Sequence, residues 1–225
     1  MSNLAFDKIN IELMGNSAII RSPSKCGRAD AAKTVKITTL VRAFQDQDRG
    51  METPILPKNT LKYVERGNKA IIYVYSEPTH FKATVGDQIY ENCSRPGLVM
   101  IIELNMEGNA WSVRDSKIFA IKDDRLLINN ETKLYGLPFP NISDDGWICW
   151  GSNASGGTFH SLTGLGMLID RLFGSPFNNH VFHANTFRHL GINSHHDFFK
   201  YIQDKNVFPE ELLLRPINDY RLGDM

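Results

Sequence analysis

Apart from one ambiguous segment over residues 34–44, segments typical of β-strands make up most of the ordered patterns in the first 135 residues, and segments typical of helices follow them. Because the two kinds of element are grouped and do not alternate, this order predicts an α+β fold with an antiparallel meander and excludes repeated βαβ units. Residues 98–104 are apolar except for Glu103 and predict a central strand. The predicted strands cover residues 8–13, 18–21, 70–75, 81–85, 97–104, 111–113 and 117–121.

The N-terminal region contains one turn signal and one ambiguous segment. Gly15-Asn16 separates the first two predicted strands and is typical of a tight hairpin turn. In residues 34–44, β-branched side chains favour a strand, whereas apolar residues at helical spacing favour a helix, and we predict the helix. We expect residues 1–50 to form a β-rich extension packed on a core of residues 51–225.

Helical patterns dominate the chain after the predicted strands. Residues 161–173 place five apolar side chains on one face, and Ser161 is a typical N-cap for that helix. A second helix is predicted over residues 194–204, where Ser194 and Asp197 form a capping-box-like start. Pro209 begins a last short helix. The apolar face of the first helix consists of Leu162, Leu165, Leu168, Ile169 and Leu172.

The charge balance bears on the partners of the protein. Lys and Arg number 25, Asp and Glu also number 25, and the formal net charge is therefore zero. A protein that binds nucleic acid needs a clustered basic face, so we expect no nucleic-acid partner.

The longest apolar run, residues 98–102, is far below the ~20 residues that a membrane span needs. The first twelve residues include Asp7, Lys8 and Glu12 and lack a signal-peptide core, so we expect a cytoplasmic protein.

Only one of the three cysteines lies in a sequence context typical of a reactive site. Cys26, Cys93 and Cys149 form no C-x-x-C pair and no disulfide framework. Cys26 and Cys93 are predicted to be small buried hydrophobes. Cys149 follows a proline-stiffened approach and the Asp145-Gly146 turn, and small polar residues come after it. These surroundings leave room for another chain to reach the sulfur, and they make Cys149 the candidate nucleophile.

The residues around Cys149 resemble the active-site signature of ubiquitin-conjugating enzymes. The matching residues are Pro140-Asn141-Ile142, then Asp145-Gly146, then Ile148-Cys149. In that family an asparagine precedes the cysteine by eight residues, as Asn141 precedes Cys149 here.

A longer similarity points to a bacterial branch of that family, the one that includes PRTRC system protein B. It covers about residues 50–180 and includes Leu56-Pro57-Lys58, the Leu-Tyr-x-x-Pro-x-x-Asn approach from Leu134, Cys149-Trp150-Gly151 and residues 173–177. The resemblance implies a core in which a meander sheet is followed by the cysteine loop and then by helices.

The resemblance also implies an activity and partners. A conjugating enzyme accepts a ubiquitin-like modifier from an activating enzyme as a thioester, here on Cys149, and transfers it to a target amine. Such bacterial proteins sit in operons with an activating enzyme, a ubiquitin-like modifier and a JAB-type metallopeptidase, and some of these operons act in antiphage defence. The reaction needs a thiol and stabilisation of a tetrahedral oxyanion, and it needs no cofactor.

Asn141 has two predicted roles, which can hold together. The resemblance implies that its amide donates to the oxyanion, and an Asx-turn that braces the loop is the structural alternative. The chain also departs from the family. Phe139 stands where the family has histidine, and Trp150 begins a continuation unlike that of the family, so the family's lysine-guiding acid and its ligase surfaces are not carried over.

Two other functional interpretations stay open at this point, whereas a third pattern, a pair of histidines, is not expected to form a site. Cys149 with His160 would suit a cysteine peptidase or acyltransferase. A binding module that keeps the fold without activity is the non-enzymatic alternative. His180-x-x-His183 offers two metal ligands, but no third ligand stands at a recognisable spacing, so we expect no metal site.

Overall fold

The computed structural model describes residues 10–22, 31–41, 53–122, 124–151, 157–179, 181–182, 184–214 and 219–225. The chain divides into two compact units, Met1–Thr53 and Pro54–Met225. The division falls close to the predicted boundary between the N-terminal extension and the core.

The first unit is a three-stranded antiparallel sheet in the order β1-β2-β3. Gly15 has a φ of 56° in the turn between β1 and β2, so the predicted hairpin is confirmed. The ambiguous segment divides: its first residues continue β3, residues 37–41 are helical, and residues 42–44 lie outside the described part. Packing of the extension on the core stays a prediction. The strands are β1 (Asn10–Met14), β2 (Ser17–Ser22) and β3 (Ala31–Lys36).

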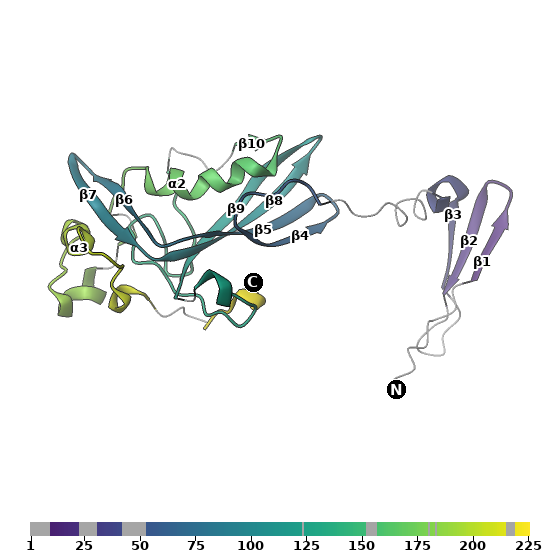
Figure 1. Ribbon diagram of the computed structural model, residues 1–225. Coiled ribbons are helices and arrows are strands. Elements are labelled where there is room, and N and C mark those ends of the chain that lie inside the picture. The colour runs from purple at the N-terminus through teal and green to yellow at the C-terminus, as the bar shows by residue number, and fades with distance from the viewer. Residues whose placement is uncertain are drawn as a thin grey trace, which may run out of the picture. The chain divides into compact units, whose positions relative to one another are not determined.

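The second unit is built on a five-stranded antiparallel sheet in the order β10-β9-β8-β5-β4 (Figure 1). Strands β6 and β7 form a separate two-stranded sheet. β8 is the middle strand of the five, so the central strand predicted over residues 98–104 is confirmed. The strands are β4 (Thr60–Arg66), β5 (Lys69–Ser76), β6 (Thr79–Val85), β7 (Gln88–Arg95), β8 (Gly97–Glu107), β9 (Ala110–Ile121) and β10 (Thr158–Phe159).

Four strands of this unit differ from the predictions: β4, β7 and β10 lie outside the predicted strands, and β9 joins two of them. Residues 111–113 and 117–121 belong to one continuous strand, β9, so the prediction of two strands was wrong. Its pairing with β8 shifts between Glu103 and Leu104, and this irregularity accommodates the polar residues that suggested a break. The first five residues of β4 are all half-buried, and β7 has its exposed side chains in adjacent pairs, so neither strand shows the alternation from which strands are predicted. The mixed α+β class with antiparallel sheets is as predicted.

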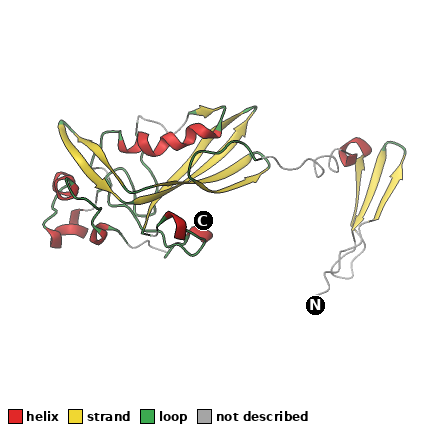
Figure 2. Cartoon of the chain, in the orientation of Figure 1, coloured by secondary structure: helices red, strands yellow, loops and turns green. Residues whose placement is uncertain are grey.

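The helices of this unit are short, and the two α-helices follow the meander (Figure 2). Ser161 accepts a hydrogen bond from Thr163 N at 3.4 Å, and Ser194 accepts one from Asp197 N at 3.1 Å, so both predicted N-caps are confirmed. No helix among the described residues is long and apolar enough to cross a lipid bilayer. The helices are η1 (Arg125–Leu127), η2 (Leu162–Gly166), α2 (Met167–Phe173), η3 (Ala184–Leu190), α3 (His195–Ile202), η4 (Glu210–Leu212) and η5 (Leu222–Asp224).

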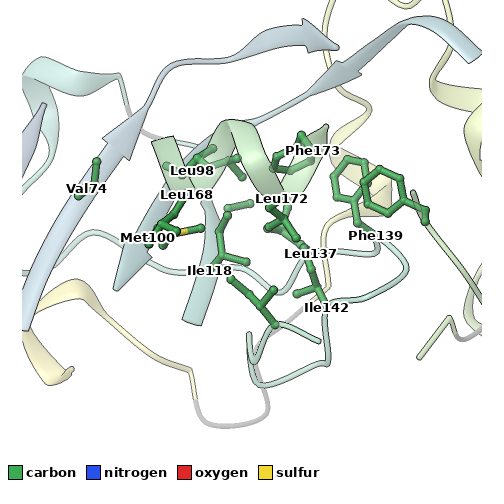
Figure 3. Close-up of a cluster of buried hydrophobic side chains, with 14 of the residues drawn as sticks. Val74, Leu98, Met100, Ile118, Leu137, Phe139, Ile142, Leu168, Leu172 and Phe173 are labelled. Atoms are coloured by element: carbon green, nitrogen blue, oxygen red, sulfur yellow. The ribbon is translucent and has the colours of Figure 1, made fainter. Parts of the chain in front are cut away.

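Helix α2 lies over one face of the five-stranded sheet (Figure 1). Leu168 and Leu172 of α2 belong to the same buried cluster as Met100 of β8 and Ile118 of β9 (Figure 3). All five side chains of the predicted apolar helix face are buried. A helix this short is unstable alone, and burial of each large apolar side chain contributes about 1.5–3 kcal/mol, so the packing against the sheet holds α2 in place.

Candidate active site

The segment before Cys149 folds back on itself as a closed loop, which we call the cysteine loop (residues 141–149). Cys149 N donates a hydrogen bond to Asn141 O at 2.8 Å, and Ser143 N donates to Trp147 O at 2.9 Å. Gly146 N donates to Ser143 O at 2.8 Å and forms the turn at the tip. The spacing of eight between asparagine and cysteine is therefore the length of one closed loop.

The tip of the cysteine loop is attached to strand β9. Ile118 N donates to Gly146 O at 2.8 Å, and Trp147 pairs with Lys117 in an isolated bridge. Gly146 has a φ of 82°, and a Cβ at this position would lie 2.7 Å from the ring of Phe119. Only glycine fits a backbone that is both left-handed and this close to a neighbour. The turn predicted from Asp145-Gly146 thus becomes the anchor of the loop.

Asn141 stands at the base of the loop and is 5% exposed, with a φ of 74°. Its Nδ2 donates to Pro176 O at 3.2 Å, and its Oδ1 accepts from Asn178 N at 3.4 Å. Asparagine is one of the few residues that tolerate this backbone conformation, and its side chain bridges to the segment that follows α2. The amide therefore braces the loop, although through a distant segment and not through the predicted Asx-turn.

Cys149 is partly exposed and lines a pocket of about 210 Å³, which we call the thiol pocket. Asn141 reaches this pocket from one side, and residues from α2 and the segment after it form the other. Trp150 also lines it, and its Nε1 donates to Ser116 Oγ of β9 at 3.0 Å. The remaining residues of the pocket are Gly151, Leu172, Ser175, Pro176 and Asn178.

The segment after α2 was not assigned a role from sequence. Pro176 and Asn178 hold the amide of Asn141, and Phe177 between them is buried and donates its N–H to Thr84 O of β6 at 2.7 Å. A proline and an asparagine just after the end of a predicted helix are the only sequence signal for such a segment. Its partner lies 35 residues earlier in the chain, and no local pattern reports a contact over that separation.

Cys93 lies in a different environment. It is fully buried on β7, and its sulfur donates to Tyr90 O at 3.6 Å. Burial raises the pKa of the Cys93 thiol to about 12, so it stays protonated at neutral pH. The prediction of a small buried hydrophobe is confirmed for Cys93, whereas Cys26 lies outside the described residues.

Phe139 occupies the position of the family histidine and is 1% exposed. Its ring lies at the centre of an aromatic cluster, and Figure 3 shows it beside Phe173. Side-chain packing therefore takes the place of any hydrogen bond that a histidine would make there. The rings within 5.8 Å of Phe139 belong to Phe81, Phe173, Phe198 and Phe208.

Asp145 supports the turn at the loop tip. Ser143 Oγ donates to the Asp145 carboxylate, and this hydrogen bond is the main cause that lowers the pKa of Asp145. Trp147 N also donates to the same oxygen at 3.5 Å. The charged carboxylate is thus engaged in shaping the loop.

In the described part of the chain, no histidine lines the thiol pocket. His160 is exposed and follows β10, which pairs with Trp111 and Ser112 of β9, and it is not among the residues that line the pocket. His180 and His183 lie outside the described residues. No group of three or more His, Cys, Asp or Glu side chains that could hold a metal ion occurs in the described part of the chain.

Comparison with known families identifies the family to which the chain belongs. The family model described as prokaryotic E2 family D matches residues 36–216. The chain belongs to this prokaryotic E2 family, and the resemblance to a bacterial family of ubiquitin-conjugating-enzyme-like proteins is confirmed. No curated protein and no solved structure matches the chain.

Proposed function

We propose that the protein accepts a bacterial ubiquitin-like modifier as a thioester on Cys149 and transfers it to an amine of a target protein. The observation that carries the proposal is the setting of Cys149. Cys149 is partly exposed and lines the thiol pocket, and its loop is closed onto Asn141 by a main-chain hydrogen bond. Membership of the E2 family supports the reaction class, a transferase, and a cysteine thioester is the route of transfer that we propose.

The chemistry consists of two acyl transfers. The thiolate of Cys149 attacks the thioester carbonyl of the modifier on the activating enzyme, and the thiol of that enzyme leaves. A target amine then attacks the new thioester, loses a proton to solvent, and displaces the Cys149 thiolate as the amide forms. Each step passes through a tetrahedral oxyanion, which a neutral N–H donor stabilises.

Asn141 is the donor that we assign to this oxyanion. A side-chain amide nitrogen carries two N–H groups, and Pro176 O accepts one of them. The second N–H is the one we assign to the reaction, because Asn141 and Cys149 line the same pocket. Bracing the loop and donating to the oxyanion are compatible roles for one amide.

The proposal extends to the fold and the partners. Residues 51–225 form a variant of the conjugating-enzyme core, in which the meander, the cysteine loop and the later helices succeed one another along the chain. The modifier and an activating enzyme are the partners that the family implies, and the target protein is a third. We place the reaction in the cytoplasm, and we propose that the gene belongs to an operon of the antiphage defence type.

A charging assay tests the proposal. The protein is incubated with a ubiquitin-like modifier, its activating enzyme and ATP, and the products are separated with and without reductant. We expect an adduct that reductant removes, that Cys149→Ala abolishes, and that Cys93→Ala retains as the matched control. Cys149→Ser should give an adduct that resists thiols, since an oxygen ester replaces the thioester. Binding of the modifier without any adduct would identify an inactive module and overturn the proposal.

A substitution of Asn141 separates its two roles. Asn141→Gly keeps the left-handed backbone but removes the amide, so transfer to lysine should slow about 100-fold, as for loss of one oxyanion donor, and charging of Cys149, which passes through the same kind of oxyanion, should slow as well. Asn141→Ala adds backbone strain and should also lower stability. Equal transfer rates in wild type and Asn141→Gly would remove the donor role and leave only the brace. Peptide cleavage without ATP that is lost in His160→Ala would replace the proposal by a peptidase.

A further inference from the structure

A second pocket lies on the five-stranded sheet, away from Cys149. It has a volume of about 520 Å³, which is within the range of small-ligand sites, and it shares no residue with the thiol pocket. We call it the basic pocket. Val64, Ile71 and Tyr73 form its apolar wall, and Met225, whose main-chain oxygen accepts a hydrogen bond from the Tyr73 hydroxyl, completes this side. Ala70 and Leu104 also line the pocket, but their side chains belong to the buried cluster on the other face of the sheet.

The charged side chains of the basic pocket are unbalanced. Four of them are cations, Lys62, Arg66, Lys69 and Arg114, and one is an anion, Glu103. Glu103 pairs with Arg114 at 3.4 Å. None of the other three cations forms an ion pair with another described residue, although the whole chain has no net charge.

Two of these cations face each other across a strand pair. Arg66 of β4 and Lys69 of β5 are direct partners at the end of the β4–β5 hairpin, and Lys69 in turn stands opposite Asn105 of β8. Residues that stand directly opposite share a face of the sheet, and like charges in such pairs are destabilising. A bound anion would remove this repulsion.

Asn105 adds a polar group without a partner. Its Oδ1 is buried and accepts no hydrogen bond from another described residue, and Asn105 lines the basic pocket. A buried acceptor left without a donor costs free energy, so it indicates a position where a ligand or water completes the bonding. The pocket thus combines an apolar wall, an amide and three cations without an anionic partner.

From these observations we infer that the basic pocket binds a small organic phosphate of nucleotide size. Phosphate oxygens are ligands for which Arg and Lys are suited, and two or three negative charges would balance the three cations. The apolar wall accommodates the uncharged body of the ligand, and the Asn105 amide can hydrogen-bond its polar edge. The inference does not rest on the proposed transfer of a modifier, because it uses no residue of the thiol pocket.

Binding of ATP, measured calorimetrically with the full chain alone, tests the inference. Lys69→Glu is the decisive variant, because it places a carboxylate opposite Arg66. We expect it to weaken ATP binding at least about tenfold while raising thermal stability, since an opposite-charge pair replaces a like-charge pair. Lys200→Glu on the exposed face of α3 makes the same change in net charge and should leave ATP affinity within about twofold.

Further probes identify the part of the ligand that is recognised. Adenosine lacks the charge and inorganic phosphate lacks the body, so both should bind more weakly than ATP, and added salt should weaken ATP binding. Val64→Trp fills the pocket and should abolish ATP binding in a folded protein. The inference would be overturned if ATP bound with a Kd above about 1 mM or not at all. It would also be overturned if Lys69→Glu and Lys200→Glu lost ATP affinity equally, or if citrate or an acidic peptide bound more tightly than ATP.

Discussion

Cys93 and Cys149 carry the same side chain in two opposite settings. Cys93 sits on a strand, has no exposed surface, and holds its proton because burial raises its pKa to about 12. Cys149 sits at the end of a closed loop and lines a pocket with Asn141 and Trp150. The contrast shows that the backbone around a cysteine, more than the residue type, determines whether its sulfur can react.

The largest expected difference between the two sites is in alkylation rate. At pH 8 a thiol with a pKa of about 12 is only ~10⁻⁴ ionised, and Cys93 is also inaccessible. In a Cys26→Ser background we expect Cys149 to react with a thiol reagent more than ~10³-fold faster than Cys93. The rates are compared in proteins that also carry Cys93→Ala or Cys149→Ala. Similar rates for the two cysteines would abolish the contrast.

The support beneath the cysteine loop can be disrupted at Phe139. Phe139→His restores the family residue, but it places an imidazole without a partner in a fully aromatic cluster, so we expect a loss of about 3 kcal/mol in unfolding free energy. The loss should grow below about pH 6.5, because the unfolded state binds a proton that the buried imidazole rejects. Denaturant unfolding at several pH values measures both effects. Phe139→Leu, which stays apolar, should cost less and show no such pH dependence.

Two glycines near Cys149, Gly146 in the turn of the cysteine loop and Gly151 after it, can be compared because both have a positive φ. In Gly146→Ala the new Cβ would lie 2.7 Å from the Phe119 ring on a left-handed backbone, so we expect a loss of about 2.5 kcal/mol and slower charging of Cys149. Gly151 has a φ of 55° but no atom within 4 Å of the added Cβ, so Gly151→Ala should cost only about 1 kcal/mol. Thermal unfolding compares the variants, and equal losses would show that the contact with Phe119 is unimportant.

The smallest expected effect is a difference in unfolding free energy when each cysteine is replaced by serine. Cys93→Ser introduces a hydroxyl into the core and should cost about 1.5 kcal/mol, whereas Cys149→Ser should change the unfolding free energy by less than about 0.5 kcal/mol. Denaturant midpoints at neutral pH measure both values. A larger loss at Cys149 would mean that its thiol holds the loop together and is not free for chemistry.

Local patterns predicted those parts of the fold whose cause is local. The five-residue apolar face of the helix that begins at Leu162, the caps at Ser161 and Ser194 and the hairpin turn at Gly15 all follow from residues a few positions apart. The spacing between Asn141 and Cys149 also follows, because it spans one loop. In each case the interacting groups are neighbours in sequence.

What the sequence could not reveal depends on distant contacts. β4 and β7 are half-exposed strands whose side chains alternate poorly, so only their pairing partners define them. The brace on Asn141 comes from Pro176 and Asn178, and the aromatic cluster around Phe139 is assembled from several elements. The resemblance indicated that a histidine was missing, but it could not indicate that a packed ring replaces it.

The main-chain hydrogen bond between Cys149 N and Asn141 O affects when the cysteine loop becomes ordered. Because the loop is closed, attached to β9 and braced from the segment after α2, its conformational entropy is given up once, during folding. In the proposed reaction, the sulfur of Cys149 is therefore preorganised before an acyl donor arrives. Differences in rate between donors or acceptors then arise from how those partners approach the loop.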